Sequence, residues 1–213
     1  MSKFKINSET TPVYQPLPLP EPALSVESDL ASLILEQAQE REAIAQETPA
    51  QHLHKLYLSH EAFAQISQHI GWGKTTAENT VEQGGILLGK VYYDQEKKLY
   101  FGIVQQTLAA TTAKGSTTYL EIGHQVWKEM MDSFDALTEK EALYQDLQII
   151  GWYHTHPNQL SVFMSGTDRR TQEIFFEQHW QFAIVLNPHK KVWRAFYGRE
   201  AAECSGFVLQ SSI

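Results

Sequence analysis

Cysteine is almost absent from this sequence, which has only Cys204 among its 213 residues. A single thiol excludes an internal disulfide framework, and this fits a reducing compartment. Apolar runs of membrane-spanning length are also absent, and the first residues lack the apolar core of a secretory signal. These absences favour a soluble, cytoplasmic protein without a membrane segment.

Positive charge is also scarce. The chain has 17 lysines and arginines against 25 acidic residues, which gives a formal net charge of −8 and a pI near 5.6. No long run of lysine or arginine occurs. Nucleic acids and anionic lipid surfaces are therefore disfavoured as partners.

The composition divides the chain into three parts. Residues 1–26 are rich in proline, favour extended conformations and predict a flexible tail. Residues 27–50 place Leu30, Leu33 and Ile34 among polar residues, which predicts an amphipathic helix that docks on the domain or on a partner. Residues 51–213 are predicted to form one globular domain.

Within this domain, strand and helix patterns alternate. Mixed α/β order predicts a mixed β-sheet between helices, in a three-layer α/β/α arrangement. A stretch rich in Thr, Ala, Gly and Ser at 109–118 is predicted to be mobile and is a candidate flap or strand partner for a substrate. The expected strands are 54–59, 84–93, 98–107, 147–154, 181–187 and 192–198, and the expected helices are 60–70, 122–142 and 166–178.

A candidate metal site follows the strand at 147–154. Side chains alternate along a strand, so His154 and His156 point the same way and can share one ion. Asp168 adds a carboxylate, and two imidazoles with one carboxylate and an open fourth position are typical of a hydrolytic zinc centre. Two other interpretations stand beside this one. The histidines can simply satisfy local hydrogen bonds, and Ser165 with Asp168 can form the capping box of a helix.

Hydrolysis at such a centre also needs a group that accepts and returns a proton. Glu82 is the candidate general acid and base, because it stands at the entry to an apolar strand in the stretch Glu-Gln-Gly-Gly. The alternative is an exposed charge that protects the end of a β-strand.

Taken together, Glu82-Gln-Gly-Gly, Gly-Trp-Tyr-His154-Thr-His156-Pro and Ser165-x-x-Asp168 resemble the JAMM (MPN+) zinc metalloproteases, in the order found in that family. The resemblance covers roughly residues 52–200 and is closest in character to compact bacterial members. It implies a cytidine-deaminase-like α/β/α fold and cleavage after the C-terminal glycine of ubiquitin or a ubiquitin-like protein, by deconjugation or precursor processing.

The resemblance also implies a role for each residue. His154, His156 and Asp168 would bind one zinc ion, Glu82 would be the general acid and base, and Ser165 would help to bind the oxyanion. The implied partners are a ubiquitin-like substrate or its conjugate and the activating or conjugating enzymes of the same system.

Three departures bear on these expectations. The loop between His156 and Ser165 is one residue longer than is usual in the family. With Cys204 alone, the chain lacks the paired cysteines of the zinc deaminases, so deamination is disfavoured. It also lacks the substrate-gripping insertion of linkage-specific deubiquitinases, so that specificity does not carry over.

Two further functions remain open at this point. One is a non-catalytic scaffold of the same fold, which the completeness of the five site residues disfavours. The other is a peptidase that acts on a sulfur-carrier protein of ubiquitin-like fold, and the sequence does not separate it from a deconjugating enzyme.

Overall fold

A computed structural model describes residues 54–74, 80–94, 98–116 and 120–209. The predicted tail at 1–26 and the predicted helix at 27–50 lie outside these residues. Among the described residues, no helix is both long and apolar enough to cross a membrane.

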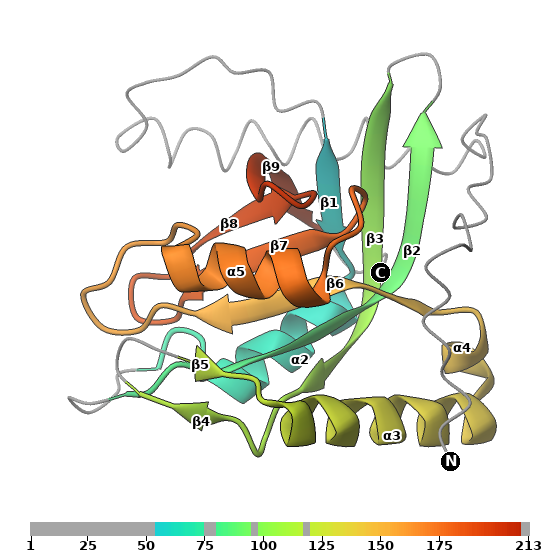
Figure 1. The fold of residues 1–213 in the computed structure, drawn as a ribbon, viewed down its shortest axis with the longest axis horizontal. Helices are drawn as coiled ribbons and strands as arrows, with labels where there is room; N and C mark the ends of the chain where they lie inside the picture. Colours follow the sequence, from blue (N-terminus) through green and yellow to red (C-terminus); the bar gives the residue numbers. More distant parts are fainter. Residues whose placement is uncertain (1–53, 75–79, 95–97, 117–119, 210–213) are drawn as a thin grey trace.

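Seven strands form one mixed sheet in the order β1-β3-β2-β6-β7-β8-β9, and pairing of β9 with β1 closes it into a barrel (Figure 1). The pairs β1–β3, β1–β9 and β6–β7 are parallel, and the other neighbours are antiparallel. The strands are β1 (Lys55–Leu58), β2 (Gly84–Asp94), β3 (Leu99–Ala109), β6 (Gln148–Thr155), β7 (Phe182–Asn187), β8 (Val192–Tyr197) and β9 (Ala202–Val208).

Helices pack against both faces of this sheet. On β7, Ile184 faces a core that contains α2, whereas Val185 faces a second core that contains α3 and α4. Figure 1 shows α5 in front of the sheet and α2 behind it. Successive apolar residues of β7 therefore contribute to two cores, one on each side of the strand. The helices are α2 (His60–Ile70), α3 (His124–Lys140), α4 (Ala142–Gln145) and α5 (Gly166–Phe175).

The predicted mixed sheet is confirmed, and α2 has the predicted bounds. Ser59 Oγ accepts a hydrogen bond from Ala62 N at 3.0 Å and begins this helix, and Gly71 ends it in the left-handed conformation with φ 64°. The other two helix predictions were too long. α3 begins at His124 instead of 122, and α5 ends at Phe175 instead of 178.

Three short or irregular strands were not predicted. β9 reads AECSGFV, with mostly weak β-formers, so tertiary pairing with β1 and β8 decides its structure. β4 (Lys114–Gly115) and β5 (Leu120–Glu121) pair with each other, and β4 lies within the stretch that was predicted to be mobile. The closure of the sheet depends on β9 and was therefore also missed.

Candidate metal centre

The end of β6 and the residue that follows it carry the two predicted histidine ligands, both in the protein interior. His154 is fully buried and His156 is 4% exposed. The indole of Trp152, two residues earlier on the same face, stacks on the His154 ring with 4.4 Å between centroids and 15° between planes. Trp152 Nε1 in turn donates a hydrogen bond of 2.6 Å to Gln172 Oε1 on α5. The strand and α5 together hold the His154 ring in place.

Asp168 meets these histidines from the first turn of α5. His154 Nε2 lies 3.3 Å from Asp168 Oδ1, and His156 Nε2 lies 3.3 Å from Asp168 Oδ2. The two Nε2 atoms are also 3.3 Å apart. One donor atom from each residue lies within 4.8 Å of the others, so the three side chains form a compact set of potential metal ligands.

Ser165 is the N-cap residue of α5 and orients the Asp168 carboxylate through hydrogen bonds. Ser165 Oγ accepts a hydrogen bond from Asp168 N at 3.2 Å, and Ser165 N donates to Asp168 Oδ2 at 2.7 Å. This is a complete capping box. The capping interpretation of Asp168 is therefore confirmed. It is compatible with the ligand interpretation, because the cap fixes the turn that presents the carboxylate to the histidines.

The protonation of the three groups reflects their burial and mutual contacts. Burial lowers the pKa of His154, which favours a neutral imidazole. Burial would also lower the pKa of His156, but its hydrogen bonds to Asp168 and to the Ser161 carbonyl raise it overall. Burial would raise the pKa of Asp168, yet the contacts with both histidines hold it well below its usual range. The set combines an ionised carboxylate with imidazole nitrogens.

These residues fit a zinc ion. Four donors about 2.0–2.1 Å from a tetrahedral zinc ion lie about 3.3 Å apart. This is the separation between the two imidazole Nε2 atoms, and between each of them and one oxygen of the Asp168 carboxylate. Electron-rich atoms at this distance repel one another unless a proton or a cation lies between them. His156 Nδ1 lies 2.7 Å from the Ser161 carbonyl oxygen. Such an outer hydrogen bond orients a histidine ligand and makes it more basic.

Glu82 lies just before β2 and is only 4% exposed, so the alternative of an exposed charge at the strand end is wrong. Glu82 N donates a hydrogen bond of 2.7 Å to the Ser116 carbonyl next to β4. The following residue, Gln83, pairs with Thr155: Gln83 N donates to Thr155 Oγ1 at 2.9 Å, and Thr155 N donates to Gln83 O at 2.8 Å. Thr155 lies between the two histidines in sequence, so this pairing connects the Glu82 backbone to the strand that carries the candidate ligands.

Burial raises the pKa of Glu82 to about 7, with His156 opposing this shift and Asp168 adding to it. A carboxyl group with a pKa near neutrality can both accept and release a proton at physiological pH. The electrostatics of Glu82 therefore suit the role that the sequence predicted.

The raised pKa predicts an effect of pH on stability. Between about pH 4.5 and 7 the folded state keeps a proton on Glu82 that the unfolded state loses, so this residue destabilises the fold as pH rises. We expect metal-free Glu82→Gln to be more stable than metal-free wild type at pH 8, by about 1–3 kcal/mol. Urea unfolding at pH 5 and pH 8 measures this difference in unfolding free energy, which should be smaller at pH 5 than at pH 8. A difference that is larger at pH 5 would contradict the raised pKa of Glu82.

Sequence reasoning missed two residues that support the site. Gln172 is fully buried one helical turn after Asp168, a spacing that places both side chains on one face of α5. Asn187, also fully buried, ends β7 and donates hydrogen bonds to the carbonyls of Asn158 and Leu160, at 3.1 and 2.9 Å. These bonds hold the loop that leads from His156 toward α5. The four-residue spacing from Asp168 could have revealed Gln172. No sequence signal could have revealed Asn187, because its hydrogen-bond partners are distant in sequence.

The chain was compared with known proteins. The sequence profile of the family described as JAB1/Mov34/MPN/PAD-1 ubiquitin protease matches residues 51–179. COP9 signalosome complex subunit 5 from Debaryomyces hansenii is 26% identical over 144 residues, which is 66% of this chain and 27% of that protein. The same subunit from Candida glabrata is 31% identical over 81 residues, or 36% of this chain and 17% of that protein.

A further relative carries a different name. NAD(+) hydrolase TcpA from Theionarchaea archaeon (strain DG-70-1) is 34% identical over 98 residues, which is 45% of this chain and 25% of that protein. The chain thus spans about a quarter or less of the length of each of these relatives.

Proposed function

The chain belongs to the JAB1/Mov34/MPN/PAD-1 ubiquitin protease family, and on this basis we propose that it is a zinc-dependent isopeptidase or peptidase. Its proposed substrates are ubiquitin or ubiquitin-like proteins, which it cleaves after the C-terminal glycine. A cytidine-deaminase-like arrangement and a cytoplasmic location remain part of this proposal. The observation that carries it is a buried Glu82, with a pKa near 7, in electrostatic contact with a buried His-His-Asp donor set.

In this proposal His154, His156 and Asp168 hold the zinc ion and leave one position open. When bound, zinc acts as a Lewis acid that polarises the scissile carbonyl and lowers the pKa of water. Glu82 accepts a proton from the attacking water and then delivers it to the departing amine. Both transfers are feasible for a group whose pKa lies near the working pH.

Ser165 is proposed to stabilise the negative charge that develops on the carbonyl oxygen. Its oxygen accepts a hydrogen bond from Asp168 N, which leaves the hydroxyl proton available for donation. The capping box fixes the serine at the start of α5, so the donor is in place before the substrate arrives. The one-residue extension of the preceding loop does not disturb this box.

The surroundings of Glu82 suit an extended substrate tail. Val81 is 43% exposed and Phe163, whose ring lies 5.3 Å from that of His156, is 48% exposed. Gly115 on β4 packs so closely on the Glu82 carbonyl that an added Cβ would lie 2.2 Å from its oxygen. We propose that β4 pairs with the substrate tail as an added strand, for which a diglycine sequence offers no steric obstacle.

The test is cleavage of ubiquitin and ubiquitin-like proteins that carry a C-terminal fusion after Gly-Gly. We expect zinc-dependent release of the fusion, loss on chelation and recovery when zinc is restored. Fusions with the terminal glycine changed to valine are the matched control and should stay intact. NAD⁺ is assayed in parallel, because one relative is named as an NAD⁺ hydrolase, and we expect no turnover.

The other outcomes of this assay would indicate a different function for the chain. Zinc-independent binding of the fusions without cleavage would indicate the non-catalytic scaffold and contradict the proposal. Cleavage confined to a sulfur-carrier protein of ubiquitin-like fold would keep the chemistry and narrow the substrate class.

A further inference from the structure

A third apolar cluster lies on the sheet, apart from the two helix-covered cores. We call it the aromatic face. By strand alternation Tyr57 points away from Leu56 and Leu58, which belong to the core under α2. The face consists of Tyr57, Tyr92, Leu99, Phe101, Ile103, Phe207 and Leu209, contributed by β1, β2, β3, β9 and the residue that follows β9.

The rings of this face form a continuous array across four neighbouring strands. Tyr92 and Phe101 are register partners and stack with 5.1 Å between centroids. Tyr57 and Phe207 are register partners as well and stack at 5.3 Å. An edge contact between Tyr57 and Phe101, at 6.4 Å, joins the two pairs. Such an aromatic surface is suited to covering by another apolar element.

None of the four described helices contributes a residue to the aromatic face. The side chains are nevertheless well excluded from solvent, since Leu99 and Phe101 are each only 6% exposed. Stacking against a neighbouring ring covers one face of an aromatic side chain and leaves the edge that points away from the sheet open. The low exposure therefore points to an additional covering element.

We propose that residues 27–50 of this same chain form an amphipathic helix that covers the aromatic face. Only residues 51–54 separate this segment from β1, whose Tyr57 belongs to the face. Five residue steps span at most about 17 Å, so the end of the segment stays next to the face. A linker this short gives the segment an effective concentration of about millimolar at the aromatic face. A helix of this length is about 36 Å long, enough to cross four strands spaced about 4.8 Å apart.

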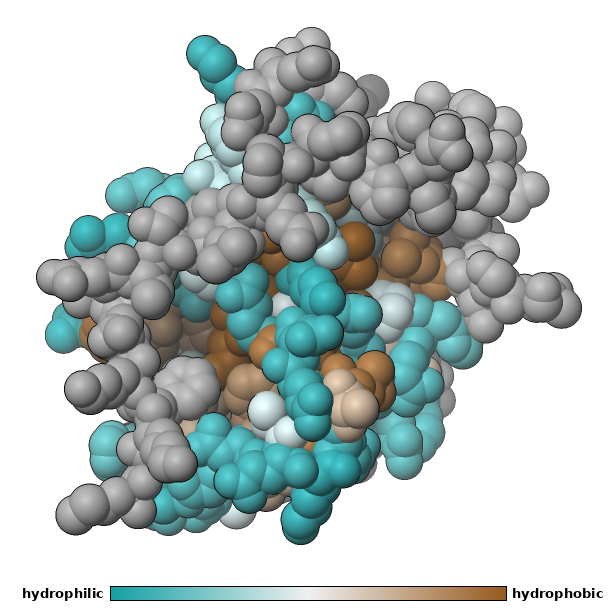
Figure 2. Space-filling view, turned by 90° about the vertical axis from the view of Figure 1, so that its right-hand side faces the viewer, coloured by the Kyte–Doolittle hydropathy of each residue, from teal (hydrophilic) through white to brown (hydrophobic). Residues whose placement is uncertain are grey.

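The two surfaces match in polarity. The segment places Leu30, Leu33 and Ile34 on one side of a helix, at three- and four-residue spacing. On the side of the molecule that carries β2, hydrophobic residues gather between hydrophilic ones (Figure 2). This match supplies the apolar contact between helix and sheet.

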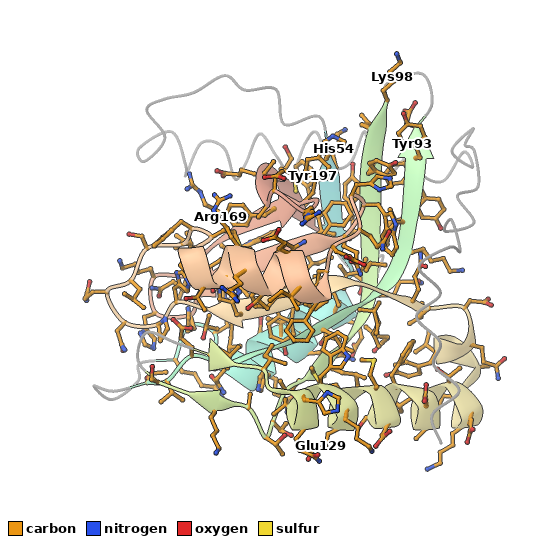
Figure 3. All side chains as sticks on the ribbon, viewed as in Figure 1. His54, Tyr93, Lys98, Glu129, Arg169 and Tyr197 are labelled. Carbon is orange, nitrogen blue, oxygen red and sulfur yellow. The ribbon has the colours of Figure 1, made fainter. Side chains whose placement is uncertain are left out.

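The two surfaces also match in charge. The segment holds six acidic residues and one arginine between positions 27 and 50. By alternation Lys55 shares the side of Tyr57, and Lys90 shares the side of Tyr92. Lys98 projects at the tip of the β2–β3 hairpin (Figure 3). Asp94 also shares the side of Tyr92, so three lysines and one aspartate border the face. An acidic helix with an apolar stripe therefore meets a border that is basic on balance.

Hydroxyl-radical footprinting of the full chain tests the proposal, because it reports the solvent access of individual side chains. The double variant Leu33→Asp/Ile34→Asp places charge in the apolar stripe. We expect several-fold faster labelling of Tyr92 and Phe207 than in wild type. The matched control is Ser32→Asp/Gln39→Asp, which adds the same charge on the opposite side of the helix at 100° per residue. The control should label like wild type.

Two internal references separate uncovering from unfolding. Tyr153 is fully buried in the core and must stay unlabelled in every variant, whereas Phe163 is exposed and must label equally in all of them. Equal labelling of Tyr92 and Phe207 in wild type and in the stripe variant overturns the proposal. The proposal is also overturned if labelling of Tyr92 and Phe207 decreases as protein concentration rises and light scattering shows a doubled mass. That result would identify a second copy of the chain as the covering element.

Discussion

Glu82→Gln is expected to lower the rate of Gly-Gly fusion cleavage at saturating zinc by about 10³-fold or more, because general acid and base catalysis contributes about 10²–10⁴-fold. Glutamine keeps the size of the side chain and its ability to form hydrogen bonds, but it cannot carry a proton between water and the leaving amine. The side chain is buried, so the substitution also removes a charge that is costly to bury. The variant should therefore fold normally and lose only turnover.

The measurement pairs cleavage rate with bound zinc, determined by elemental analysis of the same samples. Zinc content should match wild type, because Glu82 is not among the three converging donors. Glu139→Gln, on the exposed side of α3, makes the same chemical change away from the site and should cleave like wild type. A Glu82→Gln protein that cleaves at the wild-type rate would show that another group moves the proton.

The strand that carries the candidate metal ligands was predictable because its signals are local. His154 and His156 follow the two-residue period of a strand, and the apolar run before them predicted a buried strand, as observed in β6. The capping box at Ser165 is likewise a local pattern, read from residues three positions apart. Such short-range patterns can be read from sequence, because the backbone geometry of a single strand or helix determines them.

What the sequence left undetermined depends on contacts between distant residues. The closure of the barrel rests on the pairing of β9 with β1, which are separated by more than a hundred residues. The burial of Glu82 comes from its neighbours in space, among them β4, and nothing near it in sequence predicts a pKa near 7. Asn187 organises its loop through partners about thirty residues away. Tertiary packing decides these features, and local propensity does not.

His156→Ala is expected to abolish stable zinc binding and, with it, cleavage. The substitution removes one of the three proposed protein ligands, and even the loss of a partner that only orients a ligand lowers metal affinity by about 10–100-fold. It also removes the hydrogen bond to the Ser161 carbonyl and so frees the loop beyond β6. A loss of activity alone would not separate these effects. The decisive quantity is therefore the stabilisation that zinc gives to the folded protein.

Zinc at one hundred times its dissociation constant should raise the unfolding free energy of wild type by about 2.7 kcal/mol, because it binds only the folded state. The same zinc concentration should leave His156→Ala unchanged, as measured by urea unfolding with and without zinc. His60→Ala, on the exposed first turn of α2, removes a histidine outside the donor set and should keep the full stabilisation. If His156→Ala gains as much stability from zinc as wild type, this histidine is not a ligand.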